Sequence, residues 1–156
     1  MRGKTPRETR KAGRTPGKRT RSFSARFSTE LIEELEAQSS RRGESKARLA
    51  ERLIQEGLRM DEFPGVTFRS GPAGRRPGLA GGPDVWEIVR DLKRAAAAGA
   101  GNPIEIVADG SGLDPSAIEL AANYYAAYPD DIDERMRMEE EATERLRRAL
   151  GIAPAA

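Results

Sequence analysis

Residues 22–60 combine one short strand pattern with two short helix patterns, and this combination restricts the fold more than any other part of the 156-residue chain. Polar and apolar side chains alternate over residues 22–27, which predicts a strand with Phe23, Ala25 and Phe27 on one face. A lone strand leaves its backbone groups unpaired, and roughly ten apolar side chains are too few for a domain core. The segment is therefore expected to fold only with a second copy of itself.

Two helices are predicted after this strand. Ser28 or Thr29 caps the first, which carries an apolar stripe and ends at Gly43. Ser45 caps the second, whose apolar set follows a spacing of three and four residues, and residues 61–64 end it. The apolar positions expected in the shared core are Leu31, Ile32, Leu35, Leu49, Ala50, Leu53, Ile54, Gly57 and Leu58.

Pairing two copies joins the strands as an antiparallel ribbon over four helices. Phe23, Ala25 and Phe27 then face inward, and Ser22, Ser24 and Arg26 face outward. A two-stranded ribbon fits the major groove of DNA, where arginine donates two hydrogen bonds to guanine and serine pairs with either class of group. The alternative is an amphipathic helical hairpin that dimerises without binding DNA.

The segment resembles the ribbon-helix-helix family of repressors and antitoxins through the stretches FSARFSTEL (residues 23–31) and RGESK (residues 42–46). By position, the resemblance implies that Ser22, Ser24 and Arg26 read bases of an operator in double-stranded DNA. It also implies that Ser45, Lys46 and the first backbone amides of the second helix hold phosphate, as the N-terminus of a helix does.

The charge of the chain is unevenly distributed. Residues 1–26 carry ten Lys or Arg against one acid, Glu8, whereas residues 102–156 carry five bases against twelve acids. Residues 1–21 hold no large apolar side chain after Met1, which predicts a disordered basic tail that attracts DNA phosphate. The alternative is a solvated arm. The acidic end indicates a different partner, since it would repel DNA.

Residues 63–129 are expected to form a second small domain. Prolines and glycines over residues 64–83 predict short extended pieces and turns, and helices are predicted over about residues 84–98, 104–108 and 114–128. The expected fold is thus mainly α: a dimeric ribbon-helix-helix over residues 22–62, a helix-turn-helix-like domain over 63–129, and an amphipathic helix with a short tail over 130–156.

The second domain resembles a helix-turn-helix domain of uncharacterised function that follows a DNA-binding head in antitoxins of PIN-like ribonuclease toxins. The stretches that carry the resemblance are PGVTFR (64–69), GRR (74–76), LAGGPDVW (79–86) and AANYY (121–125). Together the two resemblances imply a VapB-like antitoxin that represses its own operon and neutralises a PIN-like ribonuclease. The alternative is a stand-alone regulator whose C-terminal domain dimerises or senses a ligand. A separate basic patch at Arg69, Arg75 and Arg76 is a further possibility.

The last helix, over about residues 130–150, has an apolar face, with acids at its start and arginines at its end, as the helix dipole favours. One interpretation is a helix that covers its own domain; the other is a surface for the toxin. The residues expected to bind the toxin are Ile132, Met136, Arg145, Leu146, Arg147 and Arg148.

Composition argues against several other classes of protein. The chain has no cysteine and no histidine, so the usual thiol nucleophiles, imidazole bases and zinc ligands are missing. Acids at Asp130, Asp131, Asp133 and Glu134 are the only candidate catalytic constellation, and they match the start of a helix. No apolar run is long enough to span a membrane. We therefore expect a cytoplasmic protein that is no enzyme and has no cofactor, metal or membrane partner.

Overall fold

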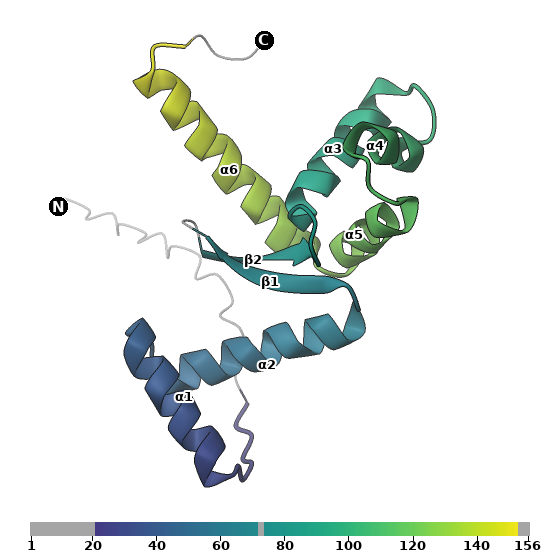
Figure 1. Cartoon of the computed structure of the whole chain (residues 1–156). Helices are drawn as coiled ribbons and strands as arrows, with labels where there is room; N and C mark the ends of the chain where they lie inside the picture. The colour runs from purple at the N-terminus through teal and green to yellow at the C-terminus, as the bar shows by residue number, and fades with distance from the viewer. Residues whose placement is uncertain (1–20, 72–73, 153–156) are drawn as a thin grey trace, which may run out of the picture.

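The computed structural model describes residues 21–71 and 74–152. The described part contains six helices and one small antiparallel sheet, so the expectation of a mainly α protein is confirmed (Figure 1). The elements are α1 (Thr29–Arg42), α2 (Lys46–Glu62), β1 (Val66–Gly71), β2 (Gly74–Leu79), α3 (Val85–Ala98), α4 (Pro103–Ser111), α5 (Pro115–Ala127) and α6 (Pro129–Ala149).

The first two helices begin and end where their capping residues predict. The Ser28 hydroxyl accepts a hydrogen bond from the Leu31 amide (3.2 Å), and Gly43 ends α1 in the left-handed conformation, with φ of 61°. The Ser45 hydroxyl accepts from the Arg48 amide (3.3 Å) at the start of α2. Local capping chemistry therefore determines this helical hairpin.

The strand predicted over residues 22–27 is not formed within the single chain. Residues 21–28 have no regular secondary structure and all are exposed. A strand is stable only when its amide and carbonyl groups find a neighbouring strand, and the described residues of this chain offer none to this segment. The basic tail predicted over residues 1–21 lies outside the described residues, apart from Arg21.

The sheet is a hairpin that follows the helices, within the stretch predicted as extended pieces and turns. In its register Arg69 faces Arg76, Thr67 faces Gly78 and Gly71 faces Gly74. The Arg76 guanidinium lies where a Cβ on Gly71 would stand, and that of Arg69 lies where a Cβ on Gly78 would stand. Both glycines are therefore needed for the arginines to lie across the hairpin.

Helices α3 to α6 pack with the hairpin around a common core. Its fully buried side chains include Val85 and Val89 of α3, Ile118 and Tyr124 of α5, and Ile132 of α6. Asp114 caps α5, with Pro115 at its first position, close to the predicted start at residue 114. Helix α6 begins one residue earlier than expected, because Pro129 occupies its first position rather than only ending α5. No helix in the described ranges is both long and apolar enough to cross a membrane.

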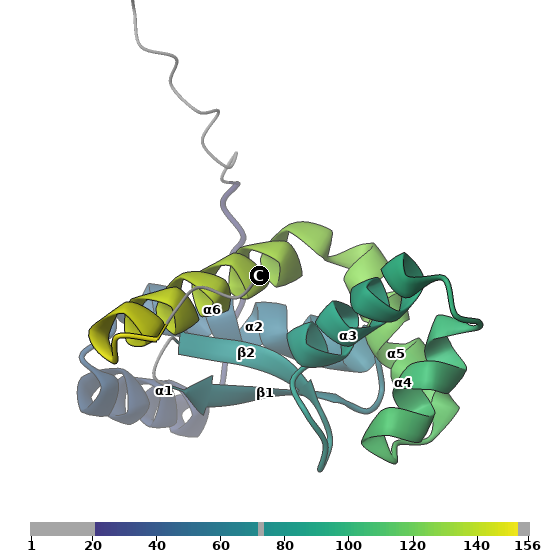
Figure 2. The same ribbon diagram turned by 90° about the horizontal axis from the view of Figure 1, so that it is seen from above.

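The two halves of the chain are joined by side chains of α2. The Arg59 guanidinium pairs with Asp131 (2.6 Å) and lies over the Tyr128 ring, 4.1 Å from its centroid. The Tyr128 hydroxyl donates to Glu62 (2.6 Å). These contacts hold the end of α2 against the junction of α5 and α6. From this junction α2 and α6 diverge on the two sides of the hairpin (Figure 1), and both run toward the same end of the molecule when seen from above (Figure 2).

Candidate nucleic-acid interface

The N-terminal helices carry an apolar face that nothing in the described chain covers. Leu49 is the only apolar side chain of residues 21–62 that is buried. By contrast, Ile54 is 53% exposed and Leu58 66% exposed, although both occupy positions expected in a core. The exposed large apolar residues of this segment are Phe23, Phe27, Leu31, Ile32, Leu53, Ile54, Leu58 and Met60. We call residues 21–62 the N-terminal module and this set its open apolar face.

Such a face is unusual for a folded monomer. Single exposed apolar side chains are common on protein surfaces, whereas a contiguous patch of leucine, isoleucine and phenylalanine marks an interaction site. The module is also short, and Leu49 is the one apolar side chain that it buries fully. It is thus an incomplete core, as the sequence pattern indicates.

The three residues predicted to read bases lie together in the extended segment before α1. Ser22, Ser24 and Arg26 are all exposed, and the structure gives none of them a side-chain partner among the described residues. Phe23, between two of them, is 86% exposed. Their position is compatible with a ribbon, but the single chain does not form one.

The two residues predicted to hold phosphate stand at the start of α2. Ser45 uses its hydroxyl oxygen as the helix cap, which leaves its proton available to a ligand. The Lys46 ammonium pairs with Glu36 of α1 (2.5 Å), and both side chains are about half exposed. Exposed ion pairs contribute only about 0–1 kcal/mol, so a phosphate group can replace Glu36 at little cost.

Three arginines beside this helix start were missed by the sequence reasoning. Arg41 and Arg42 end α1, and Arg48 lies in the first turn of α2; all three are exposed. The adjacent acid, Glu44, is tied to Arg52 (2.9 Å), whose hydrogen bond lowers the pKa of Glu44. The sequence does carry a signal for this cluster, because basic residues stand on both sides of Gly43, the residue that ends α1. Together with Lys46 they give the turn between α1 and α2 a positive surface.

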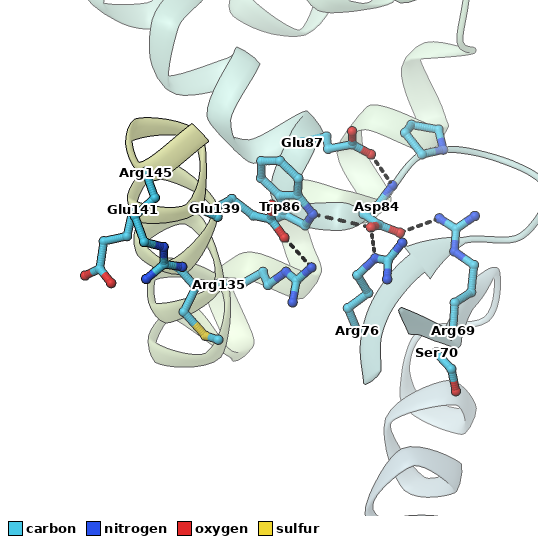
Figure 3. A pocket seen from close by; sticks show the side chains of 13 residues that line it. Arg69, Ser70, Arg76, Asp84, Trp86, Glu87, Arg135, Glu139, Glu141 and Arg145 are labelled. Atoms are coloured by element: carbon cyan, nitrogen blue, oxygen red, sulfur yellow. Dashed lines mark hydrogen bonds and ion pairs between the residues drawn. The ribbon is translucent and has the colours of Figure 1, made fainter. Parts of the chain in front are cut away.

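The basic patch considered for Arg69, Arg75 and Arg76 is not formed, because each arginine has an acidic partner. Arg69 pairs with Asp84 (2.7 Å), and Arg76 pairs with the second oxygen of the same carboxylate (Figure 3). Arg75 forms two hydrogen bonds to the buried Glu56 of α2 (2.6 and 2.8 Å). These arginines hold the hairpin to α3 and α2 and do not offer free charge.

The last helix divides into a packed start and a projecting end. Ile132 is fully buried in the core (0% exposed) and has no surface to offer a toxin, so its assignment to a partner surface is corrected. Met136 is half-buried against the same core. Beyond it, Leu146 is 59% exposed, Arg145 and Arg148 are exposed, and Arg147 is half-buried.

A groove of about 680 Å³ separates this projecting end from the hairpin and the start of α3. Figure 3 shows Trp86 and Arg135 between α6 and the hairpin, with Arg145 and Glu141 on α6. Four arginines and four acids line the groove, so their formal charges balance. It has no excess charge that would select an ionic ligand.

Three of the four acids at the start of α6 form ion pairs. Asp131 pairs with Arg59, Glu134 with Arg137, and Asp133 with Lys93 (2.8 Å), whose hydrogen bond lowers the pKa of Asp133. Within residues 21–71 and 74–152 there is no group of three or more side chains suited to hold a metal ion. These acids have a structural explanation, as helix-start charges and partners of α2 and α3.

Comparisons of the chain with family models, with curated proteins and with solved structures found no match.

Proposed function

We propose that this chain is a DNA-binding regulator that acts as a dimer through its N-terminal module. The open apolar face supports the proposal most strongly, because it is the surface that a second copy of the module would cover. In the dimer, residues 22–27 of two copies form a ribbon over a four-helix core, the arrangement that the ribbon-helix-helix resemblance implies. The exposure of residues 21–28, which have no regular secondary structure in the single chain, is compatible with this role.

In this proposal the outward side chains of the ribbon enter the major groove of an operator. Arg26 is the strongest reader, because a guanidinium donates two hydrogen bonds to guanine. Ser22 and Ser24, which have shorter side chains, contact bases beside it. The start of α2, with Ser45, Lys46 and the neighbouring arginines, holds the phosphate backbone. The basic residues 1–20 add attraction for DNA of any sequence.

Replacing Arg26 by alanine is expected to weaken specific DNA binding by about 1–3 kcal/mol, the contribution of one bidentate base contact. The measurement is a titration with duplexes selected from random DNA by the wild-type protein. Arg137→Ala, on the far helix α6, is the matched control and should leave the affinity unchanged. Equal affinities of the Arg26→Ala and wild-type dimers would remove Arg26 from the base-reading set.

We further propose that the projecting end of α6 binds a partner protein, and that the chain is the antitoxin of a PIN-like ribonuclease. Leu146 and Leu150 are exposed beside Arg145 and Arg148, which is a suitable surface for a partner with an apolar groove and an acidic site. Arginine pairs well with the clustered carboxylates of such a nuclease. In this proposal the dimer also represses transcription of its own operon. The alternative is a stand-alone regulator that has no toxin.

Truncation after Glu141 separates the two proposed roles. It removes Arg145, Arg148 and the exposed leucines of α6 but keeps Ile132 and Met136, which pack against the core. We expect unchanged DNA affinity and a loss of nuclease inhibition, measured on the same preparations with the PIN-like ribonuclease encoded in the operon. Full inhibition by the truncated protein would place the inhibitory surface elsewhere. An operon without such a nuclease would favour the stand-alone regulator.

A further inference from the structure

Gly57 stands in the middle of α2, where a glycine is unfavourable. Glycine in a helix interior costs about 1 kcal/mol relative to alanine, because its backbone loses more freedom on folding. A Cβ added to Gly57 would meet no atom within 4 Å in the described chain. Its backbone is not in the left-handed region that requires glycine. Nothing among the described residues of one copy therefore accounts for a glycine at this position.

The surroundings of Gly57 are apolar and open. Helical spacing places Ala50, Leu53 and Ile54 on the same side of α2 as Gly57, with Leu58 at its edge. Leu53, Ile54 and Leu58 are all exposed. The buried Leu49 borders this face beside Leu53, and the buried Glu56 lies further round the helix, where it pairs with Arg75 of the hairpin. Glu51, Arg52 and Glu56 lie about 100° or more around the helix from Gly57, whereas the exposed Asp61, one turn further on, shares its side of α2.

From these observations we infer that two α2 helices, one from each copy, cross at Gly57. The inference rests on the proposed dimer and states where its helices meet. In a two-fold dimer the same patch of each copy forms the contact, so a residue on the axis meets its own equivalent. Glycine against glycine allows the two backbones to approach closely, while Leu53 and Ile54 pack around the crossing point.

A second copy is the occupant that this surface favours. The neighbours of Gly57 toward the start of α2, Ala50, Leu53 and Ile54, are uncharged, so two copies can meet there without repulsion between like charges, and the nearest acid is Asp61, one turn beyond Gly57. The exposed Phe23 and Phe27 extend the same apolar module, so that one two-fold contact would cover both features. Gly110 in α4 provides the contrast. It is also a helical glycine with nothing near its Cβ, but Asp109 and Ser111 flank it and no exposed leucine or isoleucine surrounds it along α4 except Ile106.

The experiment compares Gly57→Ala, Gly57→Leu and Gly110→Ala in the full chain. Sedimentation equilibrium gives the dimer dissociation constant, and far-ultraviolet circular dichroism gives the helix content. Added methyl groups at a close contact force the helices apart, so Gly57→Ala should raise the dissociation constant about tenfold and Gly57→Leu about a hundredfold or more. Gly110→Ala should leave it unchanged. Since alanine and leucine favour helix over glycine, a loss of dimer cannot come from a weaker α2.

The results distinguish the crossing at Gly57 from the existence of the dimer itself. Wild-type affinity in the Gly57→Leu protein, with the wild type itself dimeric, would overturn the crossing at Gly57 but leave the dimer intact. A wild-type chain that is monomeric at every concentration would overturn the proposed dimer, and the crossing with it. A tighter Gly57→Ala dimer would also overturn the crossing, because it would show that the two backbones leave room for a Cβ at this position.

Discussion

Replacing Ile54 by aspartate is expected to convert the protein from a dimer to a monomer and to abolish specific DNA binding. Ile54 lies in the open apolar face, so a carboxylate there would be buried without a partner when two copies meet. An uncompensated buried charge costs several kcal/mol, and the two-fold dimer contains two. The dimer dissociation constant should therefore rise by at least about a thousandfold. Light scattering coupled to size-exclusion chromatography measures the mass, to be compared with 17.0 kDa for one chain.

The matched control is Ile106→Asp. Ile106 is an exposed isoleucine of α4, outside the N-terminal module. Its substitution should change neither the mass nor the DNA affinity. If the Ile54→Asp protein remains a dimer that binds DNA, the open apolar face is not the dimer interface.

Replacing Asp84 by alanine is expected to destabilise the C-terminal half of the chain. The buried Asp84 carboxylate accepts hydrogen bonds from Arg69 and Trp86 and from Arg76, so its loss leaves two guanidinium groups with no acidic partner. Removing one partner of a buried ion pair lowers the free energy of unfolding by about 3–5 kcal/mol. We expect about 3 kcal/mol, the lower end of that range, because both arginines retain some exposure to water. The loss in free energy of unfolding can be measured by urea denaturation, with the fluorescence of Trp86, which lies beside Asp84, as the signal.

Asp109→Ala provides the comparison for this substitution. Asp109 is exposed on α4, and no hydrogen bond or ion pair of its side chain occurs among the described residues. Its replacement should change the free energy of unfolding by no more than about 0.5 kcal/mol. Equal unfolding midpoints for the two variants would show that Asp84 does not hold the hairpin to α3.

The helices could be predicted from the sequence because their ends are determined by local chemistry. Ser28, Ser45 and Asp114 accept hydrogen bonds from the first free amides, and Gly43 and Gly112 end helices in the left-handed conformation. These signals need only neighbouring residues. For the same reason the helix boundaries predicted from the sequence agree with the structure to within a few residues.

Features that depend on distant residues could not be predicted in the same way. The crossing of Arg69 and Arg76 over glycines of the opposite strand requires the register of the hairpin. The burial of Ile132 requires the position of α6 against α3 and α5, and from spacing alone it cannot be distinguished from Leu146, which is exposed. The strand predicted over residues 22–27 needs a neighbour that is absent from a single chain. Its formation stays a prediction about the dimer.

The most direct test of the dimer joins two copies at the centre of the proposed ribbon. In an antiparallel pair formed by residues 22–27, a two-fold axis near Ala25 would bring the Cα atoms of its two copies to about 4.5–5.5 Å. That separation suits a disulfide, and the chain has no other cysteine. We expect Ala25→Cys to form a covalent dimer on mild oxidation that keeps its affinity for DNA, and Asn123→Cys on α5 to remain a single chain. Failure of Ala25→Cys to cross-link, in a protein that still binds DNA, would contradict the ribbon.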